Sequence, residues 1–596
     1  MATPSLVDLP DEILHTILCY ASASSATALE QTSSRFRNVA NAHLLWRHYC
    51  QADFTFWDAR HHIGHKLAAP PAAVRWKDVY KTRRLIDRAT TRLLDSILAS
   101  QTGRIEKVHQ IIGFGYDAKD TLLRHARARE EETEDYLARR YYSNAILGCL
   151  HRALAIPEWQ RLKDGADVPI HRALGVFDLL VLETGRGDFD DISAVLDEMV
   201  QGILDERPDI LARTPRARAV SIAEYLRSKN LLGIEPGREY YRIEHNFLGV
   251  ALLDEGHNSL PLISAAIYCY VAQKLGLNAN PCGFPFHVHV IIRPERGYDL
   301  DQRPLDDAAQ EGEPMYMDPF RSTAETPVSE LQSQLDYLGA LTLSRSTYLR
   351  ASRVPEIVLR CAKNILNAML QTPHNRDTSL DLARVKYAAL WAAMLFEEDP
   401  NAENAATLGA HQAQPFGHRL RRYLPSFMEL FATYFPLDVF LVEQHIIPLF
   451  RGLPEYAHLL ESIHAMKAGD QFPKQVHRRT WEHRNVRYRV GQVFRHRRYA
   501  YTAVITGWDA ECGAEEDWMQ TMGVDRLPRG RHQSFYHALV EDKSVRYVAE
   551  ENIQIIHPPL SSLPSVLVNL AGKYFKRWDH ESRRFVSNIR DEYPDD

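Results

Sequence analysis

The first fifty residues constrain the fold more than any other stretch, because they need a partner in order to be stable. Apolar residues recur at helical spacing after Pro10, a residue that suits the first turn of a helix. Two further short apolar segments follow, and the last of them closes at Trp46. Three helices of this length bury too little apolar surface without a disulfide, a metal or a partner. The two local thiols, Cys19 and Cys50, stand outside any metal-ligand pattern, so we expect a partner protein.

Three motifs mark this stretch: an L-P-x-E-I-L opening at Leu9, an S-x-R-F centre at Ser33 and an L-W close at Leu45. Through them, residues 6–50 resemble the F-box, a small helical module of ubiquitin ligases. The resemblance implies docking on the adaptor Skp1 through Leu9, Pro10, Ile13, Leu14, Ile17, Leu18, Leu45 and Trp46. An ordinary amphipathic helical hairpin is the plainer alternative.

The composition is that of an ordinary soluble protein. Of the 596 residues, 45% are hydrophobic and 25% are charged. A formal net charge of −6 provides no global attraction for nucleic acid or anionic membrane. The seven cysteines include no CxxC pair, which is typical of reduced intracellular proteins. Without a signal-peptide layout or an apolar run of membrane-spanning length, we expect a soluble protein of the cytoplasm, the nucleus or both, and no membrane partner.

Shifts in the hydrophobic pattern predict a multidomain α+β fold with five segments. These are residues 1–50, the F-box; 51–165, a helical linker region; 166–335, helices followed by strands; 336–470, a second helical region; and 482–596, a small β-barrel with a tail. The barrel is predicted from short alternating strands with glycines at the turns, and the tail covers Tyr574 to Val586. In the linker region, dense arginine and glutamate from Ala126 to Arg140 predict an exposed helix with i,i+4 ion pairs.

The third segment carries the sharpest chemical question. Pro261 begins a predicted helix that runs to about Leu275, and His287 stands at the head of a predicted strand. Asp318 comes just after another strand, Met315 to Met317. Thiol proteases and transglutaminases use this layout, in which a cysteine at a helix N-terminus has a lowered pKa, a histidine shares its proton and an aspartate orients the histidine.

Residues 168–335 resemble the SirB1 branch of the transglutaminase-like superfamily. The resemblance rests on Leu260-Pro261-Leu262, on the run that ends at His287, and on Asp318-Pro319-Phe320. It implies that Pro261 takes the place of the catalytic cysteine, while His287 and Asp318 match the other two catalytic residues. Because proline has no nucleophile, we expect a degenerate triad and a non-catalytic pseudoenzyme domain, with no cofactor and no metal. A serine attacker, Ser259 or Ser264, would require the register to shift.

Two blocks of the last segment, Tyr488 to Asp509 and Phe535 to Ile553, combine alternating apolar residues with arginines and aromatic residues. Through these blocks, residues 486–558 resemble the YccV-like domain, also called the hemimethylated-DNA-binding domain. Arginines interleaved with aromatic residues favour nucleic-acid binding, and the candidate contacts for DNA or for a client protein are Arg495, Arg497, Arg498, Tyr499 and Tyr501. Acidic residues near positions 511–517 and 541–551 offset this charge. Because this region shares a chain with the F-box-like stretch, we favour protein recognition over DNA binding.

The three regions, in this order, resemble the F-box only protein 21 family along most of the chain. The resemblance implies a substrate-recognition subunit of a Skp1–cullin–F-box ubiquitin ligase. Its partners would be Skp1, through Skp1 the cullin and RING subunits, and a protein client. Two alternatives come from other classes. The first is an active thiol-type hydrolase or amine transferase, which the absent cysteine opposes, and the second is a DNA-binding protein, which the local charge weakly favours.

Overall fold

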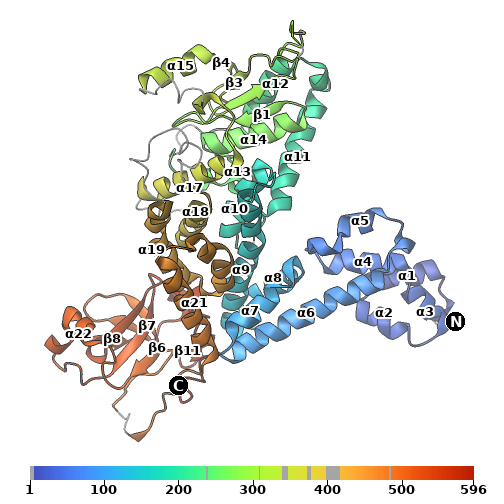
Figure 1. The fold of residues 1–596 in the computed structure, drawn as a ribbon. Coiled ribbons are helices and arrows are strands. Elements are labelled where there is room, and N and C mark those ends of the chain that lie inside the picture. Colours follow the sequence, from blue (N-terminus) through green and yellow to red (C-terminus); the bar gives the residue numbers. More distant parts are fainter. Residues whose placement is uncertain are drawn as a thin grey trace. The chain divides into compact units, whose positions relative to one another are not determined.

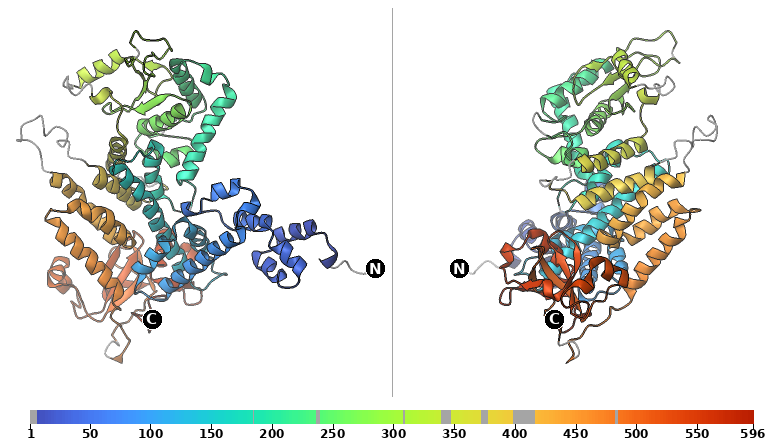
Figure 2. Two further views of the ribbon diagram at one scale, coloured as in Figure 1. Left: turned by 45° about the vertical axis from the view of Figure 1, so that its right-hand side comes forward. Right: turned by 90° about the vertical axis from the view of Figure 1, so that its left-hand side faces the viewer.

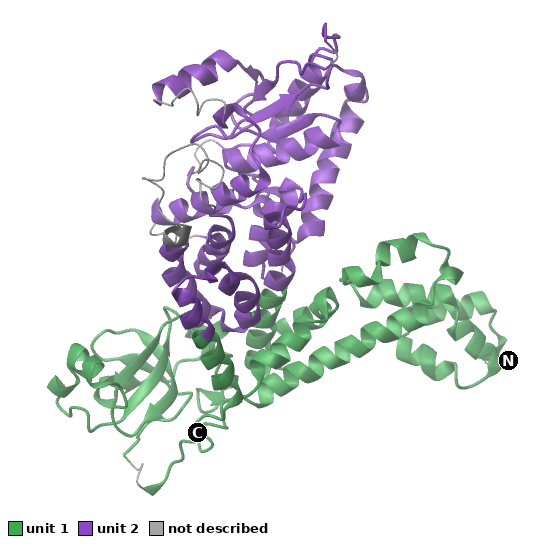
Figure 3. Cartoon of the chain, in the orientation of Figure 1, with its two compact units in different colours: residues 1–150, 461–596 green, residues 151–460 purple. Residues whose placement is uncertain are grey.

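The computed structural model describes residues 6–183, 185–235, 239–307, 309–338, 347–371, 378–397, 416–481 and 485–596. The chain divides into two compact units, one formed by residues 1–150 with 461–596 and the other by residues 151–460 (Figure 3). The first and last parts of the sequence therefore belong to the same unit. The five predicted segment boundaries stay a prediction.

Four short helices form the N-terminal region of the first unit (Figure 1): α1 (Asp11–Tyr20), α2 (Ala23–Leu29), α3 (Ser34–Ala40) and α4 (His43–Asp53). Serines set two of the helix starts, because Ser22 accepts the N–H of Ser25 and Ser33 accepts the N–H of Phe36. The small core that these helices share is completed by two aromatic residues of the long helix α6 (Trp76–Ala99), namely Trp76 and Tyr80. Part of the apolar cover that this short stretch needs thus comes from its own chain.

The expected helix from Ala126 to Arg140 is wrong. After α5 (Ile63–Ala68) and α7 (Arg104–Ile112), helix α8 (Lys119–Ala126) ends where the expected helix should begin. The next helix, α9 (Tyr136–Lys163), begins only at Tyr136. Between α8 and α9, Glu130 pairs with His580 and Glu134 pairs with Lys576. These two acidic side chains pair with a distant part of the chain, and the i,i+4 pair of Asp135 with Arg139 lies where α9 begins.

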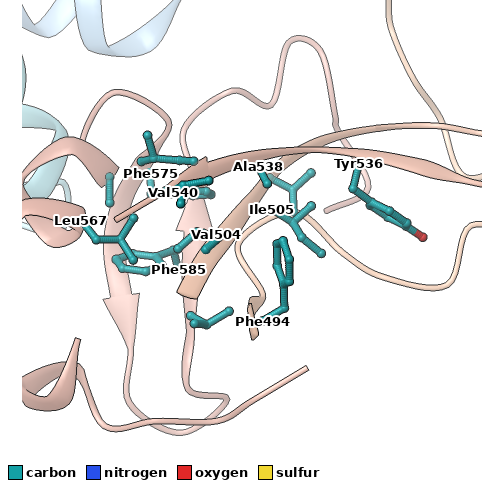
Figure 4. Close-up of a cluster of buried hydrophobic side chains, with 14 of the residues drawn as sticks. Phe494, Val504, Ile505, Tyr536, Ala538, Val540, Leu567, Phe575 and Phe585 are labelled. Carbon is teal, nitrogen blue, oxygen red and sulfur yellow. The ribbon is translucent and has the colours of Figure 1, made fainter. Parts of the chain in front are cut away.

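The C-terminal region of the first unit is an antiparallel sheet in the order β8-β7-β6-β5-β9. Its strands are β5 (Val493–His496), β6 (Thr502–Asp509), β7 (Phe535–Val540), β8 (Val545–Ala549) and β9 (Ile553–Ile555), with the helices α22 (Glu516–Met522) and α23 (Ser565–Ala571). The expected tail is instead a hairpin, β10 (Phe575–Asp579) with β11 (Arg584–Ser587). Its Phe575, Trp578 and Phe585 are buried in the same core as the sheet, as Figure 4 shows in part.

The second unit begins with a helical layer against a small sheet. The helices are α10 (Ile170–Val181), α11 (Phe189–Glu206), α12 (Pro215–Ser228), α13 (Leu248–Leu253), α14 (Pro261–Lys274) and α15 (Val328–Tyr337). The antiparallel sheet has the order β1 (Asn278–Pro281), β2 (Val290–Arg293), β3 (Met315–Met317), β4 (Glu325–Thr326). Helix α14 is buried from Pro261 through Ala272, since it packs against β1 and against α10, α11 and α12.

A buried carboxylate joins two of these helices. Asp178 of α10 accepts the N–H groups of Gly249 (2.8 Å) and Val250 (3.1 Å) in the first turn of α13. Burial raises the pKa of Asp178 to about 7, although the backbone hydrogen bonds act in the opposite direction. The first turn of α13 is therefore capped by a group that changes its charge near neutral pH.

The remaining helices of the second unit pack in successive layers (Figure 2). Helix α17 (Val354–Gln371) packs on α18 (Leu382–Phe396), and α18 packs on α19 (Phe416–Tyr434) and on α10. After α20 (Val439–Leu441) comes α21 (Glu455–Gln471). A buried ion pair supports this bundle, in which Arg152 contacts both carboxylate oxygens of Asp438 at 2.6 and 2.9 Å. Together with the mixed helix-and-sheet layer and the C-terminal sheet, these helices confirm the predicted multidomain α+β fold class.

Among the described residues, no single helix has the length and apolar character needed to cross a membrane. One bent pair of segments, Leu420–Tyr434 and Pro436–Phe450, meets those criteria of length and composition when taken together.

Candidate functional site

Two neighbouring strands bring the predicted histidine and aspartate together. In the antiparallel pair β2 and β3, Val290 lies opposite Met317, so the residues just before β2 and just after β3 meet at the same end of the pair. His287 Nε2 lies 2.9 Å from Asp318 Oδ2, and both residues are buried. This is a hydrogen-bonding distance, although the ring N–H is not aligned with the carboxylate oxygen.

A second histidine, His289, joins this pair. One ligand-capable atom from each of His287, His289 and Asp318 lies within 4.8 Å of the other two. Burial lowers the pKa of His289 to about 4, so its imidazole is neutral at pH 7. Burial raises the pKa of Asp318, but its close interaction with His287 outweighs this effect and holds the pKa below its usual value. The end of the β2–β3 pair therefore presents two imidazoles and a carboxylate.

The place of the nucleophile is filled by a structural residue. Pro261 is the first residue of α14 and is buried. The flanking Ser259 and Ser264 are fully buried, and their hydroxyl oxygens lie 2.7 Å apart in a mutual hydrogen bond. Burial raises the pKa of Cys269, and it raises that of Cys282 to about 11. These serines and thiols are held in the core as neutral groups, which is the opposite of an activated nucleophile.

The eight predicted Skp1 contacts fall into two groups. Leu14, Leu18, Leu45 and Trp46 are buried in the helical core of their own region. The other four lie toward solvent, with Pro10 exposed, Leu9 half-buried, Ile13 48% exposed and Ile17 41% exposed. Two further apolar residues that the sequence pattern did not single out, Leu6 and Val7, are also exposed. We call Leu6, Val7, Leu9, Pro10, Ile13 and Ile17 the α1 face, an apolar patch of the kind that marks interaction sites.

The C-terminal sheet carries a groove of about 1020 Å³ on the face opposite its main core. Phe535 and His537 of β7 and Tyr547 of β8 line it, since they alternate with the core residues of these strands. Tyr547 donates a hydrogen bond to Asp509 Oδ2 at 2.7 Å, and His537 Nε2 lies 3.4 Å from the same oxygen. Around this polar centre, the exposed Met522 and Val545 and the half-buried Trp518 provide apolar walls.

The five predicted contact residues of this region are not all placed alike. Arg498, Tyr499 and Tyr501 line the groove. Arg495 and Arg497 are exposed outside its lining, and each donates a hydrogen bond to a backbone carbonyl, of Ala500 and Ile553 respectively. The predicted set therefore divides into three groove residues and two arginines of the neighbouring surface.

Comparison with known proteins matches three family models to these regions. Residues 6–52 match the F-box-like family, residues 190–363 match the transglutaminase-like superfamily, and residues 486–582 match the family described as hemimethylated DNA-binding protein YccV like. The chain is 26% identical to F-box only protein 21 of Homo sapiens, and the match covers 99% of this chain and 92% of that protein. Identity and coverage are the same for F-box only protein 21 of Pongo abelii and of Mus musculus. The resemblance to the F-box only protein 21 family is confirmed. No solved structure gives a significant match.

Sequence reasoning missed three residues of these sites, His289, Trp518 and Met522, and only the first had a signal in the sequence. His289 follows His287 by two positions, a spacing that places two side chains on the same side of an extended chain, and this signal was present in the sequence. Trp518 and Met522 carried no such signal, because they lie on a helix inserted between β6 and β7 and reach the groove only through the fold.

Proposed function

We propose that this chain is the substrate-recognition subunit of a Skp1–cullin–F-box ubiquitin ligase, acting in the cytoplasm, the nucleus or both. The α1 face is the observation that carries the proposal. It leaves a patch of large apolar side chains open to solvent on a region that matches the F-box-like family. Burying such a patch against a partner is favourable because it removes apolar surface from water.

The contact with Skp1 is assigned to the outward side of α1. Ile13 and Ile17 are one helical turn apart and share one face of the helix. The buried residues Leu14 and Leu18 hold that helix on its own core from behind. Skp1 would then connect the chain to the cullin and RING subunits, and the associated ubiquitin-conjugating enzyme would supply the thioester.

The client is assigned to the groove of the YccV-like region. Its floor is aromatic, and its lining includes the acidic Glu515 and the basic Arg498, so it offers complementary groups to a polypeptide of mixed charge. Strand β8 is an edge of the sheet. An extended client segment could therefore add hydrogen bonds along an open strand while its side chains enter the groove.

The transglutaminase-like region is assigned a non-catalytic role. Pro261 supplies no nucleophile, and Ser259 and Ser264 are hydrogen-bonded to each other inside the core. We infer that this region is a pseudoenzyme that contributes a binding surface, and that the chain itself forms no covalent bond with its client.

DNA binding is the second candidate, because the end of β5 and the turn that follows it carry an exposed basic and aromatic group, Arg495, Arg497, Arg498 and Tyr499. Phosphate contacts make affinity fall steeply with salt. If DNA is the ligand, replacing Arg497 and Arg498 by alanine should weaken binding to a duplex and flatten its salt dependence. If replacing both arginines leaves the salt dependence of DNA binding unchanged, this surface is excluded as the DNA-binding site.

Proximity labelling in cells tests client recognition. Three variants of the full chain are compared with the wild type: Ile13→Asp with Ile17→Asp, Met522→Asp with Val545→Asp, and a control, Val566→Asp, on an exposed position of α23 outside the groove. Clients should lose labelling in the groove variant only, and their abundance should rise in the α1 variant. A labelled set that the groove variant leaves unchanged would contradict the proposal.

A further inference from the structure

The end of the β2–β3 strand pair gathers three metal-ligating side chains in the interior. His287, His289 and Asp318 are all more than nine-tenths buried, and their ligand atoms lie within 4.8 Å of one another. Two imidazoles and one carboxylate are a ligand set that proteins use for zinc when one coordination position stays open. Pro261 stands where a nucleophile would share its proton with His287, so His287 has no nucleophile to activate.

The groups around these side chains orient them as metal ligands are oriented. His289 Nδ1 lies 3.2 Å from the backbone oxygen of His287. A carbonyl oxygen only accepts, so Nδ1 carries the proton in this hydrogen bond and the lone pair of the neutral ring is on Nε2. Histidine ligands in metalloproteins are commonly held in this way by a backbone carbonyl.

The carboxylate is oriented by the backbone as well. Asp318 Oδ1 accepts the N–H of Arg321 at 3.2 Å, while Oδ2 is the oxygen turned toward His287. His287 Nε2 is buried without an aligned hydrogen bond in spite of the 2.9 Å separation. The ring nitrogen and the carboxylate oxygen face each other without a well-directed N–H between them. Two ligands of the same cation face each other in this way.

We propose that His287, His289 and Asp318 bind a zinc ion. Zinc bound tetrahedrally, with bonds of about 2.0–2.1 Å, holds its ligand atoms about 3.3 Å apart. His287 Nε2 and Asp318 Oδ2 are 2.9 Å apart, and the three ligand atoms all lie within 4.8 Å of one another, so small side-chain movements reach that geometry. The aromatic rings of Phe284, 5.1 Å from the ring of His289, and Phe320, 5.8 Å from that of His287, wall the site. The zinc would join β2 to β3 at the point where an active relative would position its catalytic histidine.

The test uses the purified full chain, stripped with a chelator and then titrated with Zn²⁺ or with Co²⁺ as a spectroscopic probe. The expected result is one ion per chain, visible-region Co²⁺ absorption bands of a tetrahedral site, and a zinc-dependent rise in melting temperature. His289→Asn keeps an N–H donor near the position of Nδ1 but removes Nε2, and Asp318→Asn keeps the shape of the carboxylate. Each should weaken Zn²⁺ affinity by more than the roughly 10–100-fold that loss of an outer-shell partner costs.

His532→Ala is the matched control, since His532 is exposed in the other unit. It should leave stoichiometry, absorption bands and affinity unchanged. The proposal is overturned if the wild-type chain binds no Zn²⁺ and shows no Co²⁺ bands, because the three residues are then only a hydrogen-bonded remnant of a triad. It is also overturned if His289→Asn and Asp318→Asn bind the ion as tightly as the wild type, because the ion then sits elsewhere.

Discussion

Truncating the α1 face should weaken the affinity for Skp1 by a calculable amount. Fully burying an isoleucine side chain contributes roughly 1.5–3 kcal/mol. Ile13 and Ile17 have 48% and 41% of their surface still exposed, so a partner that covers both gains about half of that contribution from each. The double variant Ile13→Ala with Ile17→Ala should therefore lose about 2 kcal/mol of binding free energy, which is about 30-fold in Kd.

The assay is calorimetric titration of purified Skp1 into the full chain. Alanine is the best helix former, which offsets part of the packing that the two substitutions remove, so α1 should still fold. Leu85→Ala, at another exposed apolar position on α6, is the control and should leave Kd unchanged. The reasoning fails if the double variant changes Kd by less than about threefold, or if Leu85→Ala weakens binding equally.

Three further outcomes are expected. Asp438→Asn should cost about 3–5 kcal/mol of unfolding free energy, because it removes the negative charge that the buried guanidinium of Arg152 contacts through two nitrogens, and thermal or denaturant unfolding of the full chain measures this. Burial raises the pKa of Asp178 from its ordinary value of 3.8 to about 7, so the folded state binds a proton that the unfolded chain releases. The unfolding free energy should therefore fall as pH rises from about 4 to 7, and Asp178→Asn should remove this loss. Thiol-reactive acyl probes should give no labelling in the second unit that depends on His287, because the cysteines described there are buried with raised pKa values. Peptide mapping of the wild type and of His287→Ala would show this.

Local patterns in the sequence were sufficient for several elements. Pro261 begins α14 as predicted, because proline at the first helical position and the apolar run behind it are local signals. The strand Met315–Met317 also lies where its pattern placed it. His287 and Asp318 were expected to meet, and they do, since the antiparallel pairing of β2 and β3 follows from the order of strands along the chain.

Features that depend on distant partners could not be predicted. The segment from Tyr574 to Val586 looked like a tail because its burial depends on the core of the C-terminal sheet, to which Phe575 and Phe585 contribute. The segment after Ala126 was predicted to be an exposed helix, because the sequence does not show that Glu130 and Glu134 pair with side chains more than 400 positions away. Sequence alone also gave Ile13 and Leu14 the same role, although the core of the N-terminal region leaves the first exposed and buries the second.

Co-expression of the full chain with Skp1, the cullin and the RING subunit, followed by size-exclusion chromatography with light scattering, decides whether the chain is a ligase subunit. A single species should contain one copy of each protein, and Ile13→Asp with Ile17→Asp should release the chain while Skp1, cullin and RING remain associated. A chain that elutes at the mass of the free polypeptide in the presence of an excess of Skp1 would contradict the proposed function.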